Sequence, residues 1–263
     1  MAAALAVCCV DEVRVLGISG GQGAGKSTLA SLLVMATEAL GRRAISVSLD
    51  DFYLSRAERQ ALARDVHPLL ATRGVPGTHD VALACQTLDS LLAAGDCQVP
   101  AFDKSVDDRA ALGRTVSGPF DLVVFEGWCV GVPSEPAARL VEPINDLERT
   151  EDPDGRWRAY VNGALENDYP ALWARLETLL FLKVPDMAAV IRWRTQQEQA
   201  HPAERRMTDE AIARFVAHYE RLTRWMTESM SVRADLLALL DDEHRLVGIV
   251  AGRSAQRRAE QRN

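Results

Sequence analysis

One stretch of the sequence has the residue types and spacing to bind the phosphate chain of a nucleotide. Residues 20–28 match the pattern G-x-x-x-x-G-K-[ST] at every position. The glycines let the backbone curl so that successive N–H groups point at an anion. Lys26 adds a positive charge for the outer phosphates, and the Ser27 hydroxyl is a ligand for Mg²⁺. This phosphate loop predicts binding of a nucleoside triphosphate. The residues expected to contact the nucleotide are Gly20, Gly21, Gln22, Gly23, Ala24, Gly25, Lys26, Ser27 and Thr28.

The flanking residues place the phosphate loop between a strand and a helix. Residues 13–18 are β-rich, and residues 29–40 have the periodicity of an amphipathic helix. The N-terminus of such a helix is the positive end of its dipole and would point at the same phosphates. This context favours a true phosphate site over a chance glycine loop.

Two aspartates follow the next short apolar strand, at residues 44–48. Asp50 and Asp51 would therefore lie at the carboxyl end of a strand, which is the edge where open α/β sheets bind ligands. An alternative is that one of them only caps the helix that starts near Arg56. We expect one aspartate in each role.

A third predicted core strand, at residues 121–127, runs from four apolar residues directly into Glu126. A buried strand that delivers an acid to the same sheet edge suits a phosphate-bound Mg²⁺, directly or through water. A simple strand-end turn is the alternative.

Polar loops replace buried strands between residues 56 and 120. Helices are expected at 56–69 and 81–93, separated and followed by Gly/Pro-punctuated loops at 73–80 and 100–109. These loops are rich in Arg, His, Asp and Lys, and loops longer than a connection needs are often functional. Solvated surface loops are the alternative.

The C-terminal part of the sequence predicts a lid. We expect a helix at 186–199, a break at 201–206 and a second helix from 208 to about 226. Four arginines in the first helix and the break give this region its positive charge. Phosphoryl transfer needs cations that arrive as the site closes, although these side chains could instead form a solvated face. Residues 128–170 are expected to be irregular and to pack near the site. The arginines are Arg192, Arg194, Arg205 and Arg206.

Composition limits the class of protein. A chain of 263 residues can bury one large α/β core or two small ones at most. The net charge of −7 argues against a general nucleic-acid binder. The five cysteines form no C-x-x-C pair and are expected to be reduced. No apolar run approaches a membrane span, and the apolar N-terminal run lacks the basic region of a secretion signal. We expect a single cytoplasmic domain, 1–263, with no nucleic-acid or membrane partner.

These pieces, in this order, resemble the uridine kinase, pantothenate kinase and phosphoribulokinase group of P-loop small-molecule kinases. Stretches 74–80, 100–105, 126–131 and 193–198 are similar to plant-type D-glycerate 3-kinase and its microbial relatives. The resemblance implies a three-layer α/β P-loop NTPase fold with a mainly parallel sheet. We expect five strands, the last two at 178–184 and 245–250, with a substrate-binding insertion at about 52–120 and a lid at about 186–210.

The resemblance also implies roles by position. ATP and Mg²⁺ would be the cofactors, with the metal at Ser27 and Glu126. Asp50 would be the base toward an acceptor hydroxyl, Lys26 would act on the phosphates, and D-glycerate would be the expected acceptor. The lid would supply Arg192 and Arg194. The acceptor pocket would be lined by Asp51, Tyr53, His79, Asp80, Lys104 and Arg109.

One departure concerns the acceptor. Residues 106–109 follow Ser105 at once, where the plant-type enzymes have a longer glycine-rich stretch. Pantothenate, a nucleoside or a sugar phosphate therefore stays open as acceptor. A GTPase-like switch is disfavoured because the sequence has no Asn-Lys-x-Asp motif and no Asp-x-x-Gly after the third strand. A nucleotide-binding module without catalysis would leave Asp50 and Glu126 idle.

Overall fold

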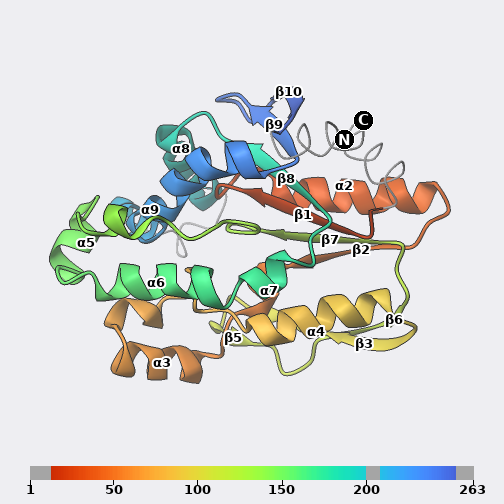
Figure 1. Ribbon diagram of the computed structural model, residues 1–263, viewed down its shortest axis with the longest axis horizontal. Helices are drawn as coiled ribbons and strands as arrows, with labels where there is room; N and C mark the ends of the chain where they lie inside the picture. Colours follow the sequence, from red (N-terminus) through yellow and green to blue (C-terminus); the bar gives the residue numbers. More distant parts are fainter. Residues whose placement is uncertain (1–12, 200–207, 253–263) are drawn as a thin grey trace.

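A six-stranded sheet carries the phosphate loop at the end of one of its inner strands (Figure 1). The computed structural model describes residues 13–199 and 208–252. Neighbouring strands of this sheet run parallel, except that the last strand pairs antiparallel at one edge. In order across the sheet the strands are β10 (Leu246–Ala251), β9 (Leu236–Leu240), β8 (Thr178–Lys183), β1 (Val15–Gly20), β7 (Leu122–Gly127) and β2 (Ala44–Ser48).

The α/β class and the mainly parallel sheet are confirmed, but the expected count of five strands is wrong. The missed strand is β9, whose five residues read Leu-Leu-Ala-Leu-Leu. Short leucine-rich runs cannot be assigned to strand or helix by periodicity alone. The preceding helix α9 (Asp209–Arg233) also runs past residue 226, so the strand follows its end almost directly.

Helices cover both faces of the sheet (Figure 1). Helices α2 (Lys26–Ala39) and α8 (Met187–Gln199) pack on one face through residues such as Leu33 and Trp193. On the other face lie α4 (Val81–Leu92), α6 (Arg156–Asn167), α7 (Pro170–Trp173) and α9.

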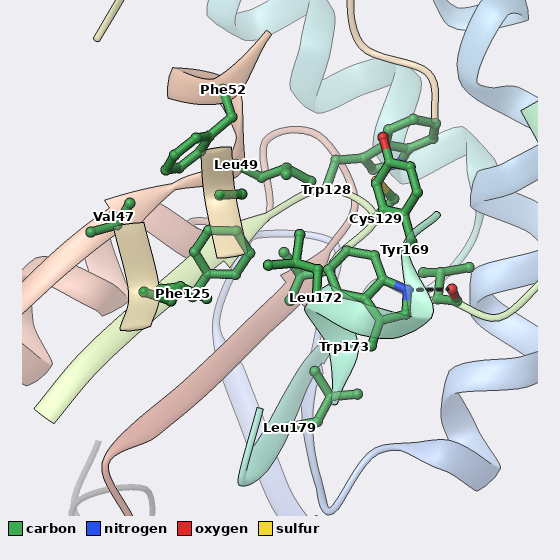
Figure 2. Packing of buried hydrophobic residues seen from close by; sticks show 14 of the residues in the cluster. Val47, Leu49, Phe52, Phe125, Trp128, Cys129, Tyr169, Leu172, Trp173 and Leu179 are labelled. Atoms are coloured by element: carbon green, nitrogen blue, oxygen red, sulfur yellow. Dashed lines mark hydrogen bonds between the residues drawn. The ribbon is translucent and has the colours of Figure 1, made fainter. Parts of the chain in front are cut away.

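The core on the second face contains several large aromatic rings. Figure 2 shows Phe125 from β7 in one cluster with Trp128, Tyr169 and Trp173, and the rings of Tyr169 and Trp173 lie 5.3 Å apart. The Trp173 indole donates to the Val132 carbonyl at 3.0 Å, so this ring is buried with its polar atom satisfied. The core therefore fixes the chain that follows Glu126.

The inserted segment is more structured than its loops suggested. The predicted helix 56–69 is split into α3 (Arg56–Asp65) and a 3₁₀ turn at Pro68–Ala71. Two small antiparallel sheets pair β3 (Gly95–Val99) with β6 (Arg114–Gly118), and β4 (Phe102–Asp103) with β5 (Asp108–Arg109).

The cap of α3 is Ser55, so the expectation that Asp50 or Asp51 caps this helix is wrong. The Ser55 side chain accepts from the Glu58 N–H, and the Glu58 carboxylate accepts from the Ser55 N–H at 2.7 Å. This capping box satisfies backbone donors of the first turn without an aspartate.

The prediction of an irregular segment at 128–170 is also wrong, because it contains α5 (Asp146–Glu151), α6 and the start of α7. Buried charges tie it together, including Arg158 with Asp152 at 2.9 Å. Arg221 of α9 joins it through Glu148 at 2.7 Å. No helix in the described ranges is both long and apolar enough to cross a membrane.

Candidate active site

The phosphate loop turns sharply at two glycines. Gly23 and Gly25 have φ of 79° and 85°, a region that side chains rarely enter. Gly25 is the N-cap of α2, and its carbonyl accepts from the Leu29 N–H at 2.9 Å. The loop therefore passes directly into a helix whose first residue is Lys26.

Lys26 and Ser27 lie at the start of α2, facing the ends of two strands. The Lys26 ammonium donates to the Gly21 carbonyl at 3.0 Å. Burial lowers the pKa of Lys26, and the charges of Glu126 and Asp50 oppose that shift. The Ser27 hydroxyl donates to Glu126 Oε1 at 2.9 Å.

The register of the sheet explains why Glu126 lies beside Ser27. Glu126 of β7 lies beside Ile18 of β1 and Ser48 of β2. Ser27 and Glu126 supply a hydroxyl and a carboxylate, which are hard oxygen ligands of the kind Mg²⁺ takes together with waters and substrate phosphates. No cluster of three or more His, Cys, Asp or Glu that could hold a metal lies among residues 13–199 and 208–252. The donor set fits Mg²⁺ held partly by phosphates.

Asp50 accepts two strong hydrogen bonds. Tyr53 Oη donates to its Oδ1 at 2.7 Å, and Lys104 Nζ donates to its Oδ2 at 2.7 Å. Burial acts to raise the pKa of Asp50, but Lys104 and the Tyr53 hydroxyl outweigh it and the pKa is lowered. The carboxylate is therefore ionised at neutral pH.

Asp51 has a different environment, although it is the next residue in the same 3₁₀ turn, Leu49–Phe52. Burial raises the pKa of Asp51, while backbone hydrogen bonds at Phe102 and Ser48 act to lower it. Asp51 does not line the cleft described next.

A cleft of about 500 Å³, called here the main cleft, joins the phosphate loop to Asp50 and Glu126. Its walls come from the phosphate loop and the first turn of α2, from the ends of β2 and β7, from the inserted segment and from α9. The lining residues are Gln22, Gly23, Lys26, Ser27, Ser48, Asp50, Tyr53, Arg73, Lys104, Glu126, Gly127, Trp128, Phe215 and Tyr219.

His79 lies behind the cleft wall. Its ring stacks on Tyr53 at 4.7 Å, and its Nδ1 lies 2.6 Å from the Tyr169 hydroxyl. Burial lowers the pKa of His79 to about 4, although Asp50 acts to raise it. The imidazole is therefore neutral at pH 7 and supports Tyr53 as a packed ring rather than as a charge.

Asp80 and Arg109 also lie behind Tyr53. Asp80 caps α4 by accepting from the Leu83 N–H at 3.0 Å. Arg109 donates to Asp80 at 2.9 Å and to the Tyr53 carbonyl at 2.9 Å. Of the expected acceptor residues, Tyr53 and Lys104 line the main cleft, whereas His79, Asp80 and Arg109 hold Tyr53 in place.

Comparison with known proteins decides the family. No family model matches the chain. An uncharacterized kinase of Schizosaccharomyces pombe is 34% identical over 225 residues, which is 78% of each chain. The chain belongs to the P-loop small-molecule kinases. Chloroplastic D-glycerate 3-kinase of Arabidopsis thaliana is 34% identical over 220 residues, covering 78% of this kinase but 46% of the plant protein.

The fold of this kinase leads to the same group. The structure of D-glycerate 3-kinase from Cryptococcus neoformans superposes with a TM-score of 0.78 at 28% identity, covering 91% of this chain and 89% of that one. The kinase is an ATP-dependent phosphotransferase that acts on an alcohol group of a small molecule. Mg²⁺ is the usual metal in such enzymes.

The predicted lid is described only in part. Arg192 of α8 pairs with Asp242 in the turn between β9 and β10, and Trp193 Nε1 donates to the Asp242 carbonyl at 3.0 Å. Arg192 does not line the main cleft. The side chain of Arg194, and Arg205 and Arg206, lie outside the residues that the structure describes.

Several lining residues were not found from the sequence. Phe215 and Tyr219 lie one helical turn apart on α9, and Tyr219 packs edge-to-face on Trp128 at 4.8 Å. An apolar pair at i and i+4 marks one face of a helix. No sequence signal says that this face turns toward the main cleft rather than toward the core.

The kinase has a second cleft on the outer side of the phosphate loop. It measures about 420 Å³, and apolar side chains of α2, β8, β9 and β10 form most of its wall. We call it the apolar cleft. It is lined by Gly23, Ala24, Gly25, Thr28, Leu29, Leu32, Leu180, Leu182, Ala238, Leu240, His244, Leu246 and Ile249.

Proposed function

We propose that this kinase transfers the γ-phosphoryl group of ATP to a hydroxyl of D-glycerate. The observation that carries the proposal is the Lys104–Asp50 pair, which puts a cation and an ionised carboxylate side by side in the cleft that the phosphate loop enters. Similarity to D-glycerate 3-kinases in sequence and in fold supports the same acceptor.

In this mechanism each polar group has one task. Lys26 binds the outer phosphates, and bound Mg²⁺, held by Ser27 and Glu126, would neutralise charge on them. An acidic acceptor draws Lys104 away from Asp50, because a carboxylate competes for the ammonium. Asp50 then accepts the proton of the hydroxyl that attacks the γ-phosphorus.

We place the adenosine part of ATP in the apolar cleft. This cleft borders Gly25 and Thr28 of the phosphate loop, on the side away from Asp50. A nucleotide whose outer phosphates reach Lys26 would extend its base in that direction. Apolar walls suit the flat faces of a purine.

A nucleoside is the second candidate acceptor, because the main cleft is more aromatic than the sequence suggested. Trp128, Phe215 and Tyr219 contribute to its wall. However, only 7% of Trp128 and 7% of Tyr219 is exposed, so little of either ring could stack on a base. This burial favours the small acid.

A panel of acceptors tests the proposal. Acceptor-dependent ADP release would be measured with D-glycerate, L-glycerate, glycerol, uridine and pantothenate, and the phosphorylated carbon would be identified by ³¹P–¹H NMR. We expect D-glycerate to be the preferred acceptor and glycerol to be poor. Turnover of uridine or pantothenate without turnover of glycerate would contradict the proposal and leave the family unchanged.

A further inference from the structure

The hairpin of β4 and β5 is held in a tight turn. Asp107 in this turn has φ 57°, a conformation that costs energy for a residue other than glycine. At the start of the turn, the Asp103 carboxylate accepts hydrogen bonds from the Ser105 N–H at 2.8 Å and from the Ser105 hydroxyl at 2.6 Å.

The Asp107 carboxylate joins two arginines from the neighbouring α3 region. Asp107 Oδ2 lies 3.0 Å from Arg59, whose side chain is 1% exposed. Arg59 is itself anchored by the carbonyls of Leu54 at 3.2 Å and Ala71 at 2.8 Å. Because Arg59 is buried and bonded on several sides, it holds the Asp107 carboxylate in place. The second arginine is Arg73, which pairs with Oδ1 of the same carboxylate.

Arg73, held by its ion pair with Asp107, lines the main cleft. Its guanidinium lies over the Phe102 ring at 5.3 Å, and its backbone carbonyl accepts from the Tyr219 hydroxyl at 2.8 Å. Asp107 binds only Nη1 of the side chain. A guanidinium has five N–H donors in a planar fork, so enough remain to hold both oxygens of a carboxylate.

The charged residues that line the main cleft distinguish Arg73 from the other cations. Its cations are Lys26, Arg73 and Lys104, and its acids are Asp50 and Glu126. Lys26 belongs to the phosphate loop, and Lys104 is bonded to Asp50. Asp107 pairs with both Arg59 and Arg73, so the group of two arginines and one carboxylate keeps a net positive charge beside the cleft.

We propose that Arg73 binds the acid group of the acceptor and that Asp107 positions it. This inference rests on the proposed function, because it assumes an acidic acceptor. Arg73 would share the acid group of the acceptor with Lys104, whereas Arg109, expected in the acceptor pocket, is engaged by the Tyr53 carbonyl and Asp80. The hairpin would hold the guanidinium at a fixed point of the cleft wall.

Steady-state kinetics of Arg73→Gln and Arg73→Lys test this inference, with D-glycerate and its uncharged amide, glyceramide, as acceptors. Loss of a hydrogen bond to a charged group predicts a rise in the KM for glycerate of about 10- to 100-fold in Arg73→Gln. We expect a smaller rise in Arg73→Lys, and little change in the KM for ATP or for glyceramide. Arg64→Gln, an exposed arginine on α3, is the matched control.

Asp107→Asn tests the positioning role. Asparagine tolerates the left-handed conformation, so this change removes the charge and keeps the turn. We expect the KM for glycerate to rise by less than in Arg73→Gln, with kcat and the KM for ATP retained. Adding Asp107→Asn to Arg73→Gln should raise the KM little further, because the two residues act through one contact.

The outcomes separate the two proposals. An Arg73→Gln variant that keeps the wild-type preference for glycerate over glyceramide would overturn this inference and leave the proposed function standing. A wild-type enzyme that phosphorylates only uncharged acceptors would overturn both. Thermal melts of each variant show whether it is folded, and Arg73→Lys, which keeps the charge beside Asp107, gives the same comparison if Arg73→Gln does not fold.

Discussion

The hydroxyl of Ser27 donates to Glu126 Oε1 at 2.9 Å, across 99 positions of sequence. The first turn of α2 and the end of β7 thus bring two oxygen ligands to one point. We propose that this hydrogen bond orients both groups for a phosphate-bound metal.

Replacing Glu126 by Gln should weaken Mg²⁺ use. The amide keeps the shape and the hydrogen bond but removes the charge that attracts the cation. We expect about a 10- to 100-fold loss of turnover at low Mg²⁺, partly recovered at high Mg²⁺. Titration of the rate with MgCl₂ checks this, and Glu166→Gln on the exposed side of α6 is the control. An unchanged titration curve would remove Glu126 from the metal site.

Replacing Lys26 by Ala should reduce turnover by roughly 10²-fold or more, because charge stabilisation at the outer phosphates is a major contribution in phosphoryl transfer. Lys26 is the cation of the phosphate loop, and its ammonium bonds the Gly21 carbonyl within that loop. The measurement is kcat on a variant shown to be folded by circular dichroism. Turnover close to that of the wild type would contradict the assigned role.

Asp50→Asn should lower kcat by about 10²- to 10⁴-fold while nucleotide affinity is nearly retained. Asp51→Asn should be milder, because Asp51 does not line the main cleft. Calorimetric titration with ATP, together with kcat at saturating acceptor, separates binding from proton transfer. If the two variants ranked in the opposite order, Asp51 would be the better candidate for the base.

The pH profile should report the lowered pKa of Asp50. A base must be ionised, so kcat/KM for the acceptor, which reports the free enzyme in which Lys104 bonds Asp50, falls as pH drops through the pKa of Asp50. The lowered pKa puts this fall below the usual carboxylate range. Burial raises the pKa of Asp50, whereas Lys104 and the Tyr53 hydroxyl lower it. Tyr53→Phe removes one donor and should move the acid limb to higher pH. Tyr160→Phe, outside the cleft, should leave the acid limb of the pH profile unchanged. If the acid limb lay at the same pH in the wild type, Tyr53→Phe and Tyr160→Phe, Asp50 would be excluded as the titrating base.

A charge introduced into the apolar cleft should raise the KM for ATP more than the KM for the acceptor. Ile249 of β10 lines this cleft, and the next residue, Val250, points to the opposite side of the strand. Ile249→Glu should raise the KM for ATP about 10-fold or more, because a carboxylate facing a bound base would be desolvated. Val250→Glu is the matched control. Equal KM values for ATP in both variants would place the adenosine elsewhere.

Some features could be predicted because they are local. The phosphate loop uses the backbone of consecutive residues, so residues 20–28 suffice to predict it. The strands β1, β2, β7 and β8 are apolar runs that end at glycine, proline or an acid, and that pattern indicates both the strand and its carboxyl end. Asp50 and Glu126 could be placed at the sheet edge for the same reason.

Other features depend on partners distant in sequence. β9 has the leucine content of a helix and is a strand because β8 and β10 pair with it. The cations of the inserted loops could be identified from the sequence, but their roles could not. Each role depends on the side chains and carbonyls that the cation contacts in the folded protein. Asp80 and the Tyr53 carbonyl engage Arg109, burial keeps His79 neutral, and Asp107 holds Arg73 at the cleft. Local residue patterns were thus enough to predict the phosphate loop and the sheet edge beside it, whereas the set of charges that lines the main cleft follows from contacts between residues distant in sequence.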